Sequence, residues 1–234
     1  MPIRKRTGGN SSAKRRTKSP RAPLTRDRIL GVAIRLADKK GIASVTMRNL
    51  ARALRVEAMS LYNHVANKDA LLDGIVDIVI SEIDVPVIGG DWKKSMRARA
   101  ISAHQVLLRH PWATQLIVSR INVGPAGLRY VDATIGCLRA AGFTYAMADR
   151  AWNAIDSHIY GFTLQELNFP VDPSEYADTA TNFLPLIPAD QYPSLHALSQ
   201  LVIEGQHEGT QDFEFGLKLI LDGLERSIGS QPSG

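Results

Sequence analysis

The stretch LTRDRILGVAIRLADKKGIASVTMRNLARALRVEAMSLYNHVANKDALL, residues 24–72, contains four helical runs separated by turn residues. The first run begins after Thr25, a residue suited to the N-cap, and ends at Gly41, where a helix favours a residue with positive φ. Its apolar residues recur at intervals of three and four, which indicates a helix with one buried face. These residues are Ile29, Ala33, Leu36 and Ala37.

Two short helices follow within this stretch. The first begins after Thr46, with apolar residues on its inner face and three cations on its outer face. The cations, which favour a neighbouring phosphate backbone, are Arg48, Arg52 and Arg55. The second is predicted over residues 57–64, and its anchors are Val56, Leu61 and Val65. Two short helices joined by a tight turn form a helix-turn-helix, after which Asn67 caps a fourth helix.

This stretch resembles the DNA-binding domain of the TetR family of transcriptional regulators, and its LYNHV and NKDALL segments resemble the tetracycline-repressor branch most closely. The motifs that carry the resemblance are Lys40–Ile42, Thr46–Ala51, Leu61–Val65 and Asn67–Leu72. The resemblance implies an all-α fold with an N-terminal three-helix helix-turn-helix DNA-binding domain and a C-terminal helical ligand-binding and dimerisation domain. It also implies a double-stranded DNA operator as partner.

The resemblance assigns DNA contacts to residues of the second, third and fourth helices. These residues are Thr46, Arg48, Ala58, Met59, Ser60, Tyr62, Asn63, His64 and Lys68. His64 and Lys68 flank a helix N-terminus, which favours a phosphate, although a structural hydrogen bond is the alternative for His64. Met59 is expected to be exposed, with a core position as its alternative. Arg55 stands where many relatives have glycine, so it must adopt the turn at a conformational cost.

Charge is distributed unevenly along the 234 residues. Residues 1–24 carry 8 Lys and Arg and no acid, residues 25–70 carry 9 basic against 4 acidic residues, and residues 71–234 carry 11 basic against 19 acidic residues. A basic front on an acidic body is typical of a protein that meets a polyanion at one end. Residues 1–24 are predicted to be disordered, either as a solvated tail or as an arm that touches DNA.

The rest of the chain continues as helices. Helices are predicted over Asp91–His110, Trp112–Ser119, Pro125–Gly142, Thr144–Leu167, Ser194–Glu208 and Thr210–Ile228. Between them, Val171–Pro193 is expected to be a loop-rich connection with at most one short helix. The predicted domains are therefore a basic tail over 1–24, a helix-turn-helix domain over 25–70 and a helical ligand-binding and dimerisation domain over 71–228.

A largely apolar pocket for an unknown small-molecule effector is predicted between the helices that start at Asp91, Pro125 and Thr144. Its predicted lining is His104, Trp112, Arg120, Asn122, Trp152, His158, Phe162, Gln165 and Phe169, and each aromatic residue is equally consistent with a core position. Where the tetracycline repressor presents Asn, His and Gln to its magnesium–drug complex, this chain has Arg99, Ile117 and Thr134. No metal and no cofactor is therefore implied.

A homodimer is predicted through the helices Thr144–Leu167 and Thr210–Ile228, because both carry apolar stripes and two-fold symmetry matches a palindromic operator. The stripes comprise Ile155, Ile159 and Phe162 on the first helix and Phe213, Leu217, Ile220, Leu221 and Leu224 on the second. The proposed release mechanism is a population shift in which a ligand tilts the helix that begins at Asn67.

The sequence carries no constellation of catalytic or metal-binding residues. His104 and His110 are six residues apart, Asp156 and His158 do not share a helix face, and His207-Glu208 lacks a second histidine at metal-site spacing. The predicted function is a ligand-responsive repressor, with a constitutive DNA-binding protein as the alternative. Cys137 is expected to be an ordinary buried thiol, and the absence of a secretory or membrane-spanning segment predicts a cytoplasmic protein.

Overall fold

The computed structural model describes residues 23–207 and 212–229, and within these ranges every regular element is a helix. The α-helices are α1 (Arg26–Lys40), α2 (Met47–Leu54), α3 (Ala58–Tyr62), α4 (Lys68–Ser81), α5 (Trp92–Arg109), α6 (Ala113–Ser119), α7 (Pro125–Ala140), α8 (Tyr145–Leu167), α9 (Tyr176–Phe183), α10 (Pro193–Ile203) and α11 (Phe213–Gly229). The predicted all-α class is confirmed. Residues 1–22, which include almost all of the predicted basic tail, lie outside the described residues.

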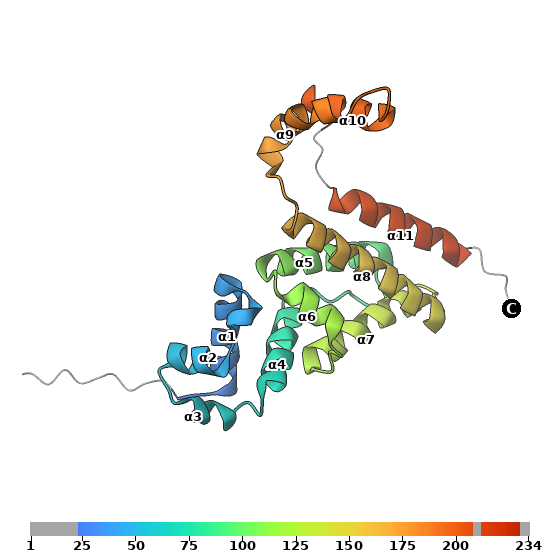
Figure 1. Cartoon of the computed structure of the whole chain (residues 1–234). Coiled ribbons are helices and arrows are strands. Elements are labelled where there is room, and N and C mark those ends of the chain that lie inside the picture. The colour runs from blue at the N-terminus through green and yellow to red at the C-terminus, as the bar shows by residue number, and fades with distance from the viewer. Residues whose placement is uncertain (1–22, 208–211, 230–234) are drawn as a thin grey trace, which may run out of the picture.

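Helices α1 to α3 form one end of the molecule (Figure 1). Thr25 and Thr46 cap α1 and α2, because each Oγ1 accepts a hydrogen bond from a backbone N–H in the first turn, at 3.2 Å in both cases. Gly41 ends α1 with φ at 75°, the positive value expected from its position. Leu50 and the predicted anchor Leu61 are fully buried, and α2 packs on both α1 and α3.

Helix α4 belongs to both halves of the molecule. It packs on α1 at one end, and it packs on α6 and α7 beyond that. Leu71, Ile75 and Val79 lie along it and are completely buried. The hydrophobic core is consequently one continuous cluster from α1 to α11 within the described residues, and the two predicted domains share α4 as a common wall.

Helices α5, α7, α8 and α11 form the bundle behind α4, and α5 and α8 each contact the other three (Figure 1). Met96, Ala100 and Leu107 of α5 are completely buried, and α5 contacts α7, α8 and α11. The thiol of Cys137 is buried within this bundle, as predicted, and burial raises its pKa. No helix in the described part of the chain is both long and apolar enough to cross a membrane.

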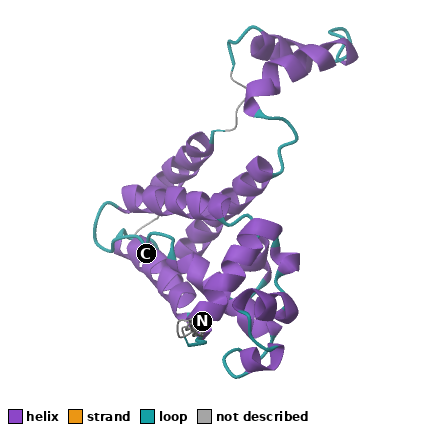
Figure 2. Ribbon diagram, turned by 90° about the vertical axis from the view of Figure 1, so that its left-hand side faces the viewer, coloured by secondary structure: helices purple, strands orange, loops and turns teal. Residues whose placement is uncertain are grey.

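Helices α9 and α10 project from the bundle as a separate arm (Figure 2). The segment predicted as a loop-rich connection contains one α-helix, α9, with a 3-10 turn on each side at 173–175 and 184–186. Helix α10 ends at Ile203, earlier than predicted, because Gly205 takes φ at 68° after it. The arm exposes several large apolar side chains: Phe183, Leu186, Leu195, Leu198 and Leu201.

Five of the eight residues predicted for a dimer interface are core residues, so for those five the assignment is wrong. Helix α5 packs against both α8 and α11, and it covers the apolar faces that were predicted to meet a partner chain. The fully or nearly fully buried members are Ile155, Ile159, Phe213, Leu217 and Leu221, while Phe162, Ile220 and Leu224 are half-buried. The apolar residues that α8 and α11 leave exposed are instead Tyr145, Leu164, Phe215 and Leu219.

Candidate DNA-binding and effector sites

The turn between α2 and α3 depends on Arg55. This residue takes φ at 58° and ψ at 47°, and among the described residues it alone has positive φ without being glycine. Its backbone N–H donates to the carbonyl of Arg52, and the N–H of Val56 donates to that of Ala51. The left-handed turn is therefore built at the position where the sequence predicted a conformational cost.

Replacing Arg55 by glycine is expected to raise the free energy of unfolding by about 0.5–1 kcal/mol, because glycine enters the left-handed region without a steric penalty. Urea unfolding of the full chain measures this change. Ala53→Gly in the exposed interior of α2 is the matched control and should lower stability by about 1 kcal/mol. Loss of stability on Arg55→Gly would show that the arginine side chain contributes more than its backbone costs.

Helix α3 presents its polar and flexible side chains to solvent. Leu61 is fully buried and anchors the helix, while Met59 is 74% exposed and Tyr62 is 44% exposed. Asn63 is exposed, and Ala58 and Ser60 are half-buried at the edge of the same helix. The predicted exposure of Met59 is therefore confirmed, and α3 offers an apolar and hydrogen-bonding surface of the size that enters a major groove.

Cationic and hydrogen-bonding groups flank α3. Arg48 is exposed in the first turn of α2, and Thr46 stands beside it as the N-cap. On the other side, Asn67 caps α4 by accepting from the N–H of Ala70 at 2.8 Å, so α4 begins at the exposed Lys68. His64 is exposed between α3 and α4. Such a helix N-terminus beside an ammonium group suits a phosphate.

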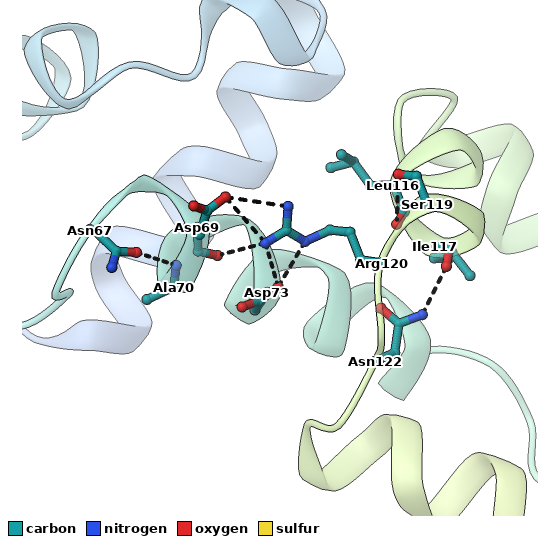
Figure 3. A network of polar contacts seen from close by, with 9 residues as sticks. All are labelled: Asn67, Asp69, Ala70, Asp73, Leu116, Ile117, Ser119, Arg120 and Asn122. Atoms are coloured by element: carbon teal, nitrogen blue, oxygen red, sulfur yellow. Dashed lines mark hydrogen bonds and ion pairs between the residues drawn. The ribbon is translucent and has the colours of Figure 1, made fainter.

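An ionic network fastens α4 to the segment between α6 and α7 (Figure 3). The guanidinium of Arg120 pairs with Asp73 at 2.7 Å and with Asp69 at 3.4 Å, and it also donates to the carbonyl of Asp69. One turn further along α4, Asp77 accepts from the N–H groups of Ala126 and Gly127, at 3.0 and 2.9 Å, and thereby caps α7. One face of α4 is thus held at three successive turns.

A cavity of about 50 Å³ lies between α4, α6, α7 and α8. Its apolar wall consists of Ile80, Ile83, Ile117 and Val131. Its polar and aromatic lining consists of Asn122, Tyr130, Trp152, Asp156 and Tyr160, and Gly127 completes the lining. This volume admits a few water molecules. Pockets that hold a drug-sized ligand measure about 300–1,000 Å³, so the helices around the cavity must separate before such a ligand enters.

Behind this cavity lies a buried ion pair. Arg99 of α5 is completely buried and faces Asp156 of α8, with Nη2 2.8 Å from Oδ1. Nη1 of Arg99 donates to the hydroxyl of Tyr130. The other carboxylate oxygen of Asp156 accepts from Trp152 Nε1 at 2.7 Å and from the hydroxyl of Tyr160 at 3.1 Å. Burial raises the pKa of both tyrosines, so they remain hydrogen-bond donors at neutral pH.

Two of the residues predicted to line the pocket, Asn122 and Trp152, lie at this cavity. Three others gather at a different place, around Phe213 at the start of α11. His104 and His158 stack on the two sides of the Phe213 ring, at 4.3 and 5.0 Å between centroids, and Phe162 meets the ring edge-on. Burial lowers the pKa of His104 despite its contact with a glutamate. This cluster joins α5, α8 and α11.

The remaining predicted pocket residues point elsewhere. Trp112 donates to Asp38 of α1 at 2.6 Å and therefore belongs to the junction between α1 and α6. Arg120 is engaged by α4, as described above, and Gln165 is exposed. Phe169 lies near Tyr176, with ring centroids 5.8 Å apart. The structure thus reassigns Trp112 and Arg120 from ligand contacts to contacts that hold α1 and α4.

Sequence reasoning missed Tyr130, Asp156 and Tyr160 as cavity residues. The available signal was Arg99, because an arginine at a position aligned with a pocket asparagine requires a buried counterion nearby. Ile117 lines the cavity, and Thr134 donates to the carbonyl of Tyr130. The two other positions compared with the tetracycline repressor therefore also lie in or beside this site.

A larger groove of about 610 Å³ runs along α5 and α11. Ionised side chains dominate its rim, including Lys93, which pairs with Asp222 and Glu225 at 2.6 Å each. The groove is open to solvent and does not touch α4. A third hollow of about 280 Å³ borders α4 at Asp73, Gly74 and Asp77, but no residue of α8 lines it. Of these three spaces only the cavity of about 50 Å³ joins α4 to α8 through a mainly apolar and aromatic lining, so we take that cavity as the candidate effector site.

The fold and these surfaces are those of a DNA-binding transcription regulator with a helical bundle behind its helix-turn-helix end. The model of the tetR family of bacterial regulatory proteins matches residues 29–75, and the tetracyclin repressor-like C-terminal domain model matches residues 86–228. The chain belongs to the TetR family. Members of this family bind operator DNA as dimers.

Individual relatives agree with this membership. An HTH-type transcriptional regulator of Saccharopolyspora erythraea is 37% identical over 59% of each chain, and the HTH-type transcriptional repressor DrrR1 of Streptomyces coeruleorubidus is 29% identical over 92% of this chain and 82% of its own. The Streptomyces coelicolor TetR family protein ActR, solved in complex with actinorhodin, superimposes with a TM-score of 0.75 at 30% identity. That match covers 89% of this chain and all of the ActR chain.

Proposed function

We propose that this chain is a cytoplasmic repressor that binds a two-fold symmetric operator as a homodimer and releases it when a small molecule enters the cavity beside α4. The observation that carries the proposal is the position of α4. Lys68 begins the helix beside α3, and Ile80 of the same helix forms part of the cavity wall. A ligand that separates the walls must therefore move the helix that carries the DNA-binding end.

The ionic network at Arg120 connects the cavity to α4. Asn122 lines the cavity and donates to the carbonyl of Ile117 at 2.9 Å, while Arg120, two residues earlier, holds α4 through Asp69 and Asp73. A ligand that displaces Asn122 pulls on the segment that positions α4. The spacing of the two recognition helices in a dimer then changes, and the operator is released.

The DNA-binding half of the proposal rests on Lys68. Replacing Lys68 by alanine is expected to weaken binding to all DNA sequences and to reduce the salt dependence of log K by about one unit per protomer, because one phosphate contact is lost. Tyr62→Ala should weaken binding similarly, whereas changes at Ala58, Met59 or Asn63 should alter sequence preference. Fluorescence anisotropy over a range of salt concentrations measures both quantities.

The matched control is Lys94→Ala, which removes an exposed ammonium group from the first turn of α5, within the bundle. It should leave the salt slope unchanged. An unchanged affinity and salt slope in a folded, dimeric Lys68→Ala protein would remove the phosphate role of this residue.

The dimer is proposed to form through the exposed apolar surface of α8, α11 and the arm. Leu164, Phe215 and Leu219 form an apolar surface on adjacent helices, and these residues are 39–63% exposed in the single chain. The arm exposes a further apolar face, and among the described elements its main contacts are internal. A second copy of the chain is the occupant that two-fold operator binding requires.

Selection of bound fragments from random DNA, followed by footprinting, tests this proposal. The expected footprint contains two inverted half-sites whose centres are about one DNA turn apart or slightly more. A single asymmetric site would contradict the dimeric mode of binding. Footprints that persist with every compound that binds the cavity would favour the alternative, a constitutive DNA-binding protein.

A further inference from the structure

The charges at the cavity suggest which chemical class of ligand it accepts. We infer that the effector is an uncharged, flat aromatic molecule that carries a carbonyl acceptor and a hydroxyl donor, and that Arg99 and Asp156 determine this specificity by excluding ions. The inference rests on the proposed function in one respect, namely that this cavity is the effector site. It concerns the choice of ligand and not the release of DNA.

The charges at the cavity form a balanced pair. Asp156 is the one cavity-lining residue in the described chain that carries a charge at neutral pH, and its partner Arg99 lies directly behind it. The two charges cancel, and both groups are buried, with Arg99 fully withdrawn from solvent. A charged ligand would add a third charge to this site without a counterion, and its desolvation would remain uncompensated. An uncharged ligand avoids that loss.

Within the described residues, the cavity wall keeps some hydrogen-bonding capacity for a ligand. Oδ2 of the Asp156 carboxylate accepts from Trp152 and Tyr160, while Oδ1 meets Nη2 of Arg99 as an ion pair at 2.8 Å and accepts no hydrogen bond within the described residues. The hydroxyl of Tyr130 accepts from Arg99, so its own proton has no acceptor in the described part of the chain. A carbonyl oxygen of the ligand would satisfy that proton.

A donor on the ligand has a complementary partner. The side-chain amide of Asn122 uses Nδ2 to hold the carbonyl of Ile117, which leaves its oxygen as an acceptor at the cavity wall. A hydroxyl group on the ligand would donate to this oxygen. Beside the ion pair of Arg99 and Asp156, the wall therefore offers a donor on Tyr130 and an acceptor on Asn122 to a single uncharged molecule.

The rest of the cavity lining is apolar and aromatic. The lining combines isoleucine and valine side chains with the indole of Trp152 and the phenol rings of Tyr130 and Tyr160. A flat ring fills the space between such walls with the smallest separation of helices, whereas a bulky aliphatic molecule needs a wider opening. Because the cavity measures only about 50 Å³, a ligand that needs less separation of the helices is favoured.

The test measures the binding of three probes that share one ring system and differ in charge. They are a monohydroxyanthraquinone, an anthraquinone carboxylate and an aminomethylanthraquinone, titrated into the full chain without DNA by tryptophan fluorescence and calorimetry. The uncharged probe is expected to bind at least about tenfold more tightly than either ion. Equal affinities, tighter binding of an ion, or no binding of any probe would overturn the inference.

Variants then test which residues produce the selection. Asp156→Asn leaves Arg99 without its counterion, so the carboxylate probe should gain about tenfold relative to the uncharged probe. Tyr160→Phe removes a hydrogen bond from the same carboxylate without changing charge, and the charge preference should stay as in the parent chain. Tyr130→Phe should weaken the uncharged probe several-fold and leave the relative affinities of the two ions unchanged. An unaltered charge preference in Asp156→Asn would overturn the role of the pair.

If Asp156→Asn does not fold, Tyr130→Phe still tests the inference. Full affinity of the uncharged probe for the Tyr130→Phe protein would exclude the Tyr130 hydroxyl as the proposed donor. The outcome is also separate from the proposed function. Selective binding of the uncharged probe with no effect on operator affinity would contradict the effector role and leave the ligand class standing. Release of DNA by a charged compound bound in this cavity would support the effector role and contradict the inferred ligand class.

Discussion

Replacing Phe215 and Leu219 together by glutamate is expected to convert the dimer into a monomer and to weaken operator binding by about 100-fold or more. The two side chains lie one turn apart on the outer face of α11 and are 63% and 56% exposed in the single chain. Two carboxylates placed there would be desolvated without partners in a dimer interface. Two linked DNA-binding modules bind about 100-fold to 10,000-fold more tightly than a single module. Separation of the protomers removes that gain in affinity.

Analytical ultracentrifugation at micromolar concentration and anisotropy on an operator fragment measure the two effects. Leu128→Glu is the matched control, because Leu128 is equally exposed on α7, at 57%, outside the proposed interface. It should leave the chain dimeric and the affinity unchanged. A Phe215→Glu, Leu219→Glu protein that stays dimeric would place the interface elsewhere.

Replacing Arg99 by methionine is expected to lower the free energy of unfolding by about 3–5 kcal/mol, the second large effect. The substitution leaves the carboxylate of Asp156 buried without its counterion. Replacing both members of the pair, as in Arg99→Met with Asp156→Leu, should recover much of this loss, because no uncompensated charge remains. Urea unfolding of the parent chain, the single variant and the double variant measures the difference.

Arg97→Met is the control for this series. Arg97 also lies on α5 and pairs with a carboxylate, Glu214, but its side chain is about half exposed. Its removal should have a small effect on stability, because solvent screens exposed ion pairs. If Arg99→Met were no more destabilising than Arg97→Met, the buried pair would carry little of the stability of the bundle.

The DNA-binding end of the fold follows closely from local sequence. The caps at Thr25, Thr46 and Asn67, the positive φ at Gly41 and the strained turn at Arg55 are all decided by residues within a few positions of each other. Local propensity and periodicity therefore predict these helices and the exposure of α3. The third helix is shorter than predicted, because the chain at Asn63 and His64 already turns towards α4.

The effector site depends on contacts that local sequence does not encode. Arg99 and Asp156 are far apart in the chain, and periodicity alone cannot bring them together. Trp112 and Arg120 have the side chains of ligand contacts, yet their partners Asp38 and Asp73 lie in α1 and α4. Only the three-dimensional arrangement shows which polar residues face the cavity and which fasten helices.

The prediction of interface residues on α8 and α11 was wrong for most of them for a related reason. A run such as Ile155 and Ile159 predicts that one face of a helix is buried, but it does not say whether the neighbour belongs to the same chain. In this fold α5 occupies that position, so the stripe is used within the protomer. The residues left for a partner are the fewer apolar ones on the opposite face.

The central claim is that one small molecule and one operator compete through α4. The most direct test takes the compound that binds the cavity most tightly and measures operator affinity with and without it, beside compound affinity with and without operator. The two ratios must be equal, and a tenfold ratio corresponds to a coupling free energy of only about 1.4 kcal/mol. We expect equal ratios of at least about ten in the parent chain and ratios near one in Arg120→Ala, which releases α4 from Asp69 and Asp73. A compound that fills the cavity and leaves operator affinity untouched in the parent chain would contradict the account.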